Sequence, residues 1–235
     1  MATVSPHIAP EVFVLAPEFR ALSIEARSLI NGPTTDFTSE ALSRACASPC
    51  AEPWAEEHRE AWRQVFRAFG AKPQRTPCSA EALLKRVQRD GVLSSVNAVV
   101  DLYNAVSLQF AVPVGGENAA AYAGPPQLVR AQGNEQFDTI QSGIAVRESP
   151  DPGEVVWRDS VGVTCRRWNW RQGVRTRIEL ATTHMWFILE ALPPMPDAAL
   201  HRAGDVLMEG LSHLSPRVTF DVKFLGTEKA PSGEA

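Results

Sequence analysis

Apolar residues recur at helical spacing in four segments of the first half of the chain. Helices are therefore predicted over residues 38–47, 53–69, 79–90 and 95–110. Their ends carry the residue types that begin and end helices. Thr38 or Ser39 caps the first helix, Pro53 is the first helical residue of the second, and Ser79 caps the third. Gly91 follows the third helix and ends it.

Alternation of apolar and polar residues predicts strands near the start of the chain and throughout its second half. Segment 22–27 alternates with a period of two, as in a half-buried strand, and segment 11–15 is short and rich in β-forming residues. Later strands are expected over 127–131, 143–147, 155–157, 161–165, 177–180, 185–191 and 218–224. A last helix is predicted over 198–214, with Asp197 as its N-cap.

This order of elements predicts an α+β fold with mostly antiparallel sheets and packed helices. The sequence shows no internal repeat and no long linker, so residues 10–225 are expected to form a single domain. Residues 1–9 are assigned to an N-terminal tail, and residues 226–235 to a disordered C-terminal tail.

Segment 95–110 combines an apolar stripe with a polar one. Its apolar stripe is expected to be buried and consists of Val96, Val99, Val100, Tyr103, Val106 and Phe110. The polar side chains of Asn97, Asp101 and Asn104 stack on another face, and Gly115 and Gly116 follow in a predicted glycine turn. Two interpretations remain open: these groups line a pocket beside the glycine turn, or they form a helix-capping network.

Composition places the chain among globular proteins. Of its 235 residues, 44% are hydrophobic, which excludes a wholly disordered chain, and the net charge of −4 excludes a histone-like polycation. No signal peptide is recognised at the N-terminus, and the longest nearly apolar run, 105–114, is far shorter than the roughly 20 residues of a membrane helix. The four cysteines are too scattered for a disulfide framework. These features predict a soluble cytoplasmic protein without a membrane partner.

The positive charge is concentrated in segment 157–177. This segment holds six arginines and one acid, Asp159, and tryptophans lie among the arginines in the R-R-W-N-W-R run at 166–171. Guanidinium groups and flat aromatic faces together suit a phosphate backbone and a stacked base. The alternative is a solvated hairpin whose arginines pair with carboxylates elsewhere.

Other chemistry finds little support in the sequence. Cys46 and Cys50 lack further ligands at the spacing of a zinc site, and no phosphate-binding or nucleophile-elbow motif occurs. Cys165 lies beside an arginine, but its predicted strand position favours burial. His184 and His213 are isolated and are expected to be structural or exposed. We therefore expect neither a metal nor a cofactor.

Several ordered motifs resemble the B3/B4 domain of the bacterial phenylalanyl-tRNA synthetase β subunit. Residues 97–104 read N-A-V-V-D-L-Y-N, similar to the N-x-V-V-D-x-T-N helix of that domain, which a Q-P-x-H-A-F-D turn follows. L-V-R-A at 128–131 and M-W-F-I-L-E-A at 185–191 match two of its strands. The likeness is closer to free-standing B3/B4 proteins, which carry V-P-V-G-G and R-R-W-N-W-R, and it extends over roughly residues 10–225.

The resemblance implies a trans-editing hydrolase that deacylates mischarged aminoacyl-tRNA, because the synthetase domain hydrolyses tRNA wrongly charged with tyrosine. By this likeness Glu190 contacts the misplaced amino acid, whereas Gly115 replaces the turn histidine of the synthetase. Hydrolysis would then depend on a positioned water, the ribose hydroxyl of the substrate and backbone N–H donors. The expected catalytic residues are Asn97, Gly115, Gly116 and Glu190. The expected substrate-binding residues are Asp101, Asn104, Glu117, Arg130 and Asn169, and the expected RNA-binding residues are Arg166, Arg167, Trp168, Trp170 and Arg171.

The expected partner is the 3′ acceptor end of tRNA, and no DNA partner is expected. Two alternatives from other classes remain open. The first is a non-catalytic module that binds tRNA, other RNA or a free amino acid. The second is an unrelated small-molecule enzyme that reuses the same pocket, since one fold hosts many functions.

Overall fold

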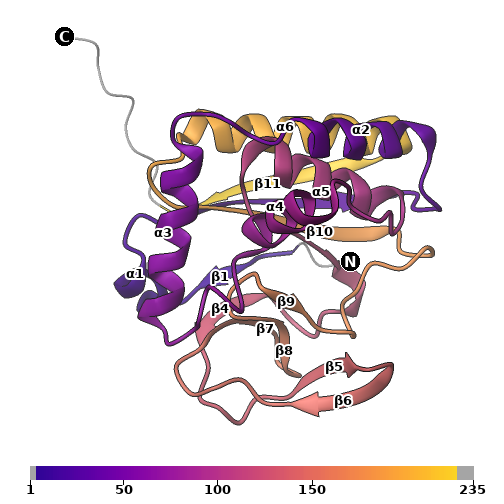
Figure 1. Ribbon diagram of the computed structural model, residues 1–235. Helices are drawn as coiled ribbons and strands as arrows, with labels where there is room; N and C mark the ends of the chain where they lie inside the picture. The colour runs from indigo at the N-terminus through magenta and orange to yellow at the C-terminus, as the bar shows by residue number, and fades with distance from the viewer. Residues whose placement is uncertain (1–3, 227–235) are drawn as a thin grey trace.

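A computed structural model describes residues 4–226 of the chain and shows an α+β architecture (Figure 1). Its helices are α1 (Pro10–Leu15), α2 (Asp36–Ala47), α3 (Ala55–Ala68), α4 (Ser79–Asp90), α5 (Ala98–Phe110), the short 3-10 turn η1 (Ala119–Ala121) and α6 (Asp197–Leu214). Its strands are β1 (His7–Ile8), β2 (Arg20–Arg27), β3 (Val114–Asn118), β4 (Gln127–Arg130), β5 (Phe137–Gln141), β6 (Ile144–Glu148), β7 (Val155–Arg158), β8 (Val163–Arg166), β9 (Arg171–Gln172), β10 (His184–Ala191) and β11 (Thr219–Leu225). The predicted fold class is confirmed.

Two sheets form the frame of the molecule. The first has the order β11-β2-β10-β3 and is antiparallel throughout, and the second has the order β1-β4-β7-β8-β9 with one parallel pair, β1 and β4. The hairpin β5–β6 stands apart at one end (Figure 1). Helices α2, α5 and α6 lie on the side of the first sheet that faces away from the second (Figure 1).

Both faces of the first sheet are buried. Leu22, Ile24 and Phe187 pack with α5 and α6 in one core, whereas Trp186 and Ile188 belong to a second core that includes residues of α3 and of the β4–β7 sheet. Successive residues of segment 22–27 therefore point into two different cores, so both faces of the strand are buried. The prediction that one face is exposed is wrong. Strand β10 is the shared wall between the two cores.

Several predicted boundaries are corrected by the structure. Segment 11–15 is helix α1, because Pro10 occupies its first turn and the local preference for strand is overridden. Segment 177–180 is an irregular loop, and strands β5 and β9 were not predicted. Residues 7–8, assigned to an N-terminal tail, pair with β4 as β1. Residues 227–235, the rest of the predicted C-terminal tail, lie outside the described residues.

Helix α5 begins three residues later than predicted. Asn97 is its N-cap, and Val96 lies before the helix with 65% of its surface exposed instead of joining the buried stripe. Strand β3 follows where a glycine turn was predicted, so Gly115 and Gly116 are paired with β10. Because the two glycines are in a strand, the register with β10 decides which of their N–H groups pair with that strand.

Candidate functional site

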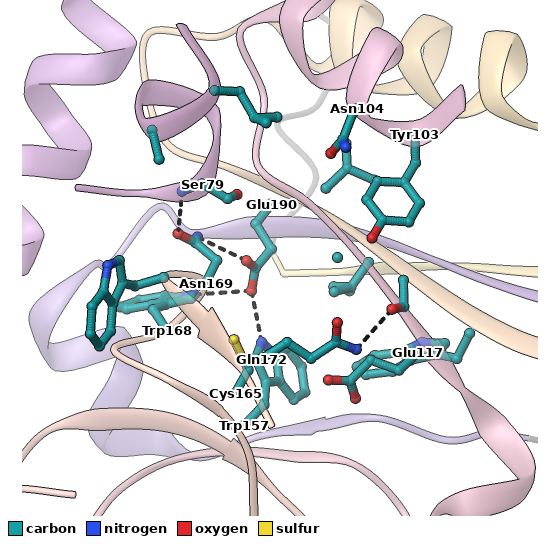
Figure 2. A pocket seen from close by; sticks show the side chains of 18 of the residues that line it. Ser79, Tyr103, Asn104, Glu117, Trp157, Cys165, Trp168, Asn169, Gln172 and Glu190 are labelled. Carbon is teal, nitrogen blue, oxygen red and sulfur yellow. Dashed lines mark hydrogen bonds between the residues drawn. The ribbon is translucent and has the colours of Figure 1, made fainter. Parts of the chain in front are cut away.

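A cavity of about 230 Å³ lies between β3 and β10 of the first sheet and the 165–172 segment of the second (Figure 2). Helices α4 and α5 complete its walls. Its aromatic lining consists of Tyr103, Trp157, Trp168, Trp170 and Trp186. Its polar lining consists of Ser79, Arg86, Asn104, Glu117, Asn169, Gln172 and Glu190. The segments that meet here are widely separated in the sequence.

Gly115 leaves the space in which the cavity forms. It pairs with Ile188 across the β3–β10 ladder, and both residues line the cavity. A Cβ atom at Gly115 would lie 3.3 Å from Ile188 Cγ2, so any side chain at this position would project into the same space. The histidine that the resembling synthetase motif places here would occupy the cavity.

Glu190 is a buried carboxyl group held by three donors. Only 1% of its surface is exposed, and its Oε1 accepts hydrogen bonds from Trp157 Nε1 at 2.9 Å and Trp168 Nε1 at 3.1 Å. Its Oε2 accepts one from Asn169 Nδ2 at 2.9 Å (Figure 2). Burial raises the pKa of Glu190 to about 7 even though these donors favour the charged form. A carboxylate has about four acceptor sites, so Oε2 can still accept from a ligand.

Glu117 is a second buried carboxyl group in the same cavity. It lies on β3 with 5% of its surface exposed, and burial raises its pKa to about 8. The neighbouring side chains of Gln172, Thr164 and Thr176 lower this pKa in part. Its Oε2 is buried and has no hydrogen-bond partner among the described residues. A buried carboxyl oxygen in this state is energetically costly unless a ligand or a proton satisfies it.

The R-R-W-N-W-R loop holds the Glu190 side chain in place. Arg167 and Trp168 both adopt the left-handed backbone conformation, with φ of 47° and 65°. Residues other than glycine rarely adopt this conformation. The resulting turn lets Trp168 N donate to Val155 O and directs Asn169 toward Glu190. Two adjacent residues in this conformation carry a backbone cost, and they persist because the surrounding contacts determine them.

Trp168 does not form a stacking surface for RNA, in contrast to the prediction. Its ring is fully buried and packs edge-to-face on Phe19 and Trp62, with centroid distances of 4.9 and 5.4 Å. Trp170 is the half-buried tryptophan of this loop. Its ring lies between two guanidinium groups, with Arg167 at 4.6 Å and Arg171 at 5.8 Å from the centroid.

Most arginines of the basic segment pair with carboxylates, as the alternative interpretation states. Arg166 is buried, and its guanidinium donates to Glu154 at 2.7 and 2.9 Å and to Glu148 at 2.8 Å. The remaining ion pairs join Arg158 to Glu135, Arg167 to Asp151 and Glu154, Arg171 to Glu148, and Arg175 to Asp159. Arg166 is therefore not positioned to bind an RNA phosphate.

Asn97 and Asp101 belong to a capping network and do not line the cavity. Asn97 Oδ1 accepts from Val100 N at 3.0 Å. Asp101 accepts from Val96 N at 2.8 Å and from the Thr34 hydroxyl at 2.5 Å. Of the predicted polar stripe, Asn104 alone lines the cavity, whereas Asn97 and Asp101 satisfy backbone N–H groups at the start of the helix.

Arg130 also lies away from the cavity. It is exposed, and its Nε donates to Gly153 O at 3.1 Å. The structure thus brings together Gly115, Gly116, Glu117, Glu190, Asn104, Asn169 and Trp170 from the predicted site, together with the buried Trp168. Asn97, Asp101, Arg130 and Arg166 are separated from them.

Helix α4 supplies a wall that sequence reasoning missed. Ser79, Ala82, Leu83 and Arg86 line the cavity, and Ser79 N donates to Asn169 Oδ1 at 3.3 Å. Their spacing of three, four and seven residues is the signal that places them on one helix face. Arg86 is exposed at the mouth and forms no salt bridge within residues 4–226. It is the one lysine or arginine among the lining residues of the described chain.

The two glycines differ in the availability of their N–H groups. Antiparallel pairs alternate between hydrogen-bonded and non-hydrogen-bonded positions, and Glu190 N donates to Pro113 O. Counting from that pair, Gly115 lies in a hydrogen-bonded position opposite Ile188, whereas the N–H of Gly116 points away from β10. Asn118, two residues after Gly116, follows the same alternation: its N–H also points away from β10 and donates to Thr176 O. The N–H of Gly116 is therefore the one of the two that does not pair with β10.

Candidate nucleophiles and metal ligands find no support in this part of the chain. Burial and the nearby carboxylates of Glu117 and Glu190 raise the pKa of Cys165 well above its usual value, which keeps the thiol protonated. His58 is buried, and burial lowers its pKa to about 4, so it is neutral and structural. No group of three or more metal-ligating side chains occurs within residues 4–226.

Fold and site together define an α+β protein with a pocket lined by aromatic and acidic side chains. The model of the B3/4 domain matches residues 61–203, more than half of the chain, and this range contains every residue that lines the pocket. The chain therefore belongs to the B3/4 domain family, which confirms the resemblance seen in the sequence motifs.

The chain is also similar to a solved structure, an N-terminal fragment of the phenylalanyl-tRNA synthetase β subunit from Pyrococcus horikoshii. The match covers 95% of this chain and 51% of that fragment, with 10% identity and a TM-score of 0.46. This chain therefore spans about half the length of the fragment it matches. No curated protein matches the chain significantly. None of the helices within residues 4–226 has the length and apolarity needed to cross a membrane.

Proposed function

We propose that this protein is a trans-editing hydrolase that removes a wrongly attached amino acid from aminoacyl-tRNA. The observation that supports this most is the single cavity in which Glu117 and Glu190 face an aromatic wall. An aminoacyl ester carries an α-ammonium group but no free carboxylate, so it is a cation. An acidic pocket lined with tryptophan favours such a cation over a zwitterionic free amino acid.

Each part of the substrate has a counterpart in the pocket. The open acceptor site of Glu190 Oε2 takes the α-ammonium, and the aromatic wall of Trp157 and Trp186 holds the side chain. Asn104 and Ser79 are polar groups that can order a water. These assignments make Glu190 a substrate-binding group. Three protein donors hold its carboxyl group in place and leave one acceptor site on Oε2 for the ligand.

Hydrolysis proceeds through a positioned water. The water oxygen attacks the ester carbonyl carbon, the bond to the ribose oxygen breaks, and the proton of the water passes to that oxygen through the neighbouring ribose hydroxyl. Negative charge on the carbonyl oxygen is stabilised by the outward N–H of Gly116. The ester is already activated, so orientation and one preorganised donor contribute much of the rate.

The RNA end lies at the mouth of the pocket in this proposal. Arg86 offers an unpaired guanidinium to a phosphate, and the half-buried ring of Trp170 offers a stacking surface flanked by Arg167 and Arg171. This replaces the predicted cluster centred on Arg166 and Trp168, both of which are buried.

A panel of mischarged tRNAs tests the proposal by following deacylation. We expect at least one aminoacyl-tRNA to be hydrolysed well above the spontaneous rate, and Glu190→Ala to change the selectivity among substrates. The matched control is Asp221→Asn, which removes a carboxylate that pairs with Lys223 on β11, a strand that does not line the pocket. Unchanged deacylation by Glu190→Ala would remove that assignment. Tight tRNA binding without hydrolysis would instead establish the non-catalytic module.

A further inference from the structure

Glu117 lies at the end of the cavity away from Glu190. Across the β3–β10 ladder Glu117 is opposite Trp186, four residues before Glu190 on the same strand face. At roughly 3.3 Å per residue, the two positions are about 13 Å apart along the strand. Both residues line the cavity, and Figure 2 shows the side chain of Gln172 between their carboxyl groups.

The two carboxyl groups differ in the hydrogen-bond partners of their oxygen atoms. Glu190 has three protein donors, whereas Glu117 Oε2 is buried with no partner among the described residues. A buried acid at this position is costly unless a ligand or a proton compensates it.

Within residues 4–226 no cation forms an ion pair with Glu117, although the charge of Arg175 lies close enough to lower the pKa of Glu117 in part. Arg86 is at the exposed mouth, and Arg175 is held by Asp159 through two hydrogen bonds of 2.8 and 2.9 Å. Tyr103, Trp186 and Gln172 add flat or neutral surfaces to the cavity lining. A positively charged group of the ligand would gain both a charge-assisted hydrogen bond and aromatic contact.

We propose that Glu117 is a specificity-determining residue that pairs with a cation at the end of the substrate side chain. The pocket then prefers basic aminoacyl esters, of the lysyl or ornithyl class, over neutral ones of equal length. The α-ammonium lies at Glu190 and the side-chain ammonium at Glu117. This inference rests on the proposed function for the ester, but ligand binding tests it independently.

The test compares L-lysine methyl ester with L-norleucine methyl ester, which has a neutral side chain of similar length. Binding to the full chain is followed by tryptophan fluorescence, since four tryptophans line the cavity. We expect the lysine ester to bind about tenfold more tightly, the factor that one charge-assisted hydrogen bond supplies. Glu117→Gln should abolish this preference and leave the affinity for the norleucine ester unchanged, and the control Asp221→Asn on β11 should change neither.

Equal affinity of the two esters for the natural protein, or a preference that survives in Glu117→Gln, would overturn the inference. If Glu117→Gln does not fold, Nε-acetyl-lysine methyl ester provides the comparison in the natural protein, because acetylation removes the charge. Binding as tight as that of the lysine ester would then contradict the role of Glu117. Failure of the proposed function can be told apart from failure of this inference. If only the proposed function fails, the Glu117-dependent preference persists while no charged tRNA is hydrolysed. Hydrolysis of neutral aminoacyl-tRNAs independent of Glu117 would reject this inference alone.

Discussion

Glu117 and Glu190 make the stability of the protein depend on pH in an unusual direction. Burial raises the pKa of each above the ordinary glutamate value of 4.5, to about 8 and about 7. The folded state therefore binds more protons than the unfolded state above pH 4.5. Stability from these two groups is present at low pH and is lost as pH rises through 7 and 8.

Glu117→Gln is expected to weaken the fall in stability between pH 6.5 and 8.5. The amide cannot ionise, so the variant avoids a buried charge and should be the more stable protein at pH 8.5. His58 does not interfere, because its pKa is lowered to about 4 and it stays neutral in this range. Urea unfolding at several pH values measures the effect. A parallel pH dependence in the variant and the natural protein would contradict it.

Gly115→Val tests whether the missing side chain keeps the cavity open. The added methyl groups would enter the space beside Ile188, where even a Cβ atom lies at 3.3 Å. We expect ligand affinity to fall by at least about tenfold, with a stability loss of about 1 kcal/mol from overpacking. Titration with the esters measures the first quantity and urea unfolding the second. Gly32→Val, at a site where a Cβ meets nothing within 4 Å, is the control.

At the scale of elements, the 166–171 loop is a structural brace with one accessible ring. Its buried arginine satisfies Glu154, which is itself buried, while its tryptophan and asparagine hold Glu190. A loop rich in arginine and tryptophan can be an RNA-binding surface or such a brace, and its composition does not distinguish the two roles. Only the positions of the acids, which come from β6 and the 148–154 segment, distinguish the two.

Arg166→Ala and Arg86→Ala are expected to separate these roles. Arg166→Ala leaves the Glu154 carboxylate buried without its partner and should cost about 3 kcal/mol in stability. Arg86→Ala, at an exposed position, should change stability by less than about 0.5 kcal/mol but reduce the salt slope of tRNA binding by about 0.7. Urea unfolding and binding at several salt concentrations measure both. An unchanged salt slope in Arg86→Ala would reject the mouth as the RNA contact.

At the scale of the whole molecule, the pocket exists because two sheets and two helices meet around β10. The residues that line it come from α4, α5, β3 and β10 and from the 157–172 segment. A ligand that binds there contacts elements from both cores and is absent from the unfolded state. Ligand binding should therefore stabilise the entire fold, not a local segment.

Saturating ester is expected to raise the unfolding free energy by about 2.7 kcal/mol when its concentration is 100 times Kd. The shift should grow with the logarithm of ligand concentration, because only the folded state binds. Thermal unfolding at increasing ester concentration measures it. A transition that broadens or splits as ester is added would show that the two cores unfold separately.

The sequence by itself determined the periodic features. Helices α3 to α6, strands β2 and β10, the α+β class and the family motifs follow from side chains a few residues apart, which local spacing records. The capping role of Asn97 was also among its stated alternatives. The failed prediction at 11–15 shows the limit, because a proline in the first turn outweighed β-forming residues.

Only the tertiary structure decided which polar groups share a cavity. Glu117 and Glu190 are 73 positions apart in the chain, yet the β3–β10 register directs both into one space with a helix, α4, that precedes them. It also decided that Arg166 pairs with Glu154 and that Asp101 caps a helix. These outcomes depend on distances between segments remote in sequence, which the packing of the sheets sets and local patterns do not contain.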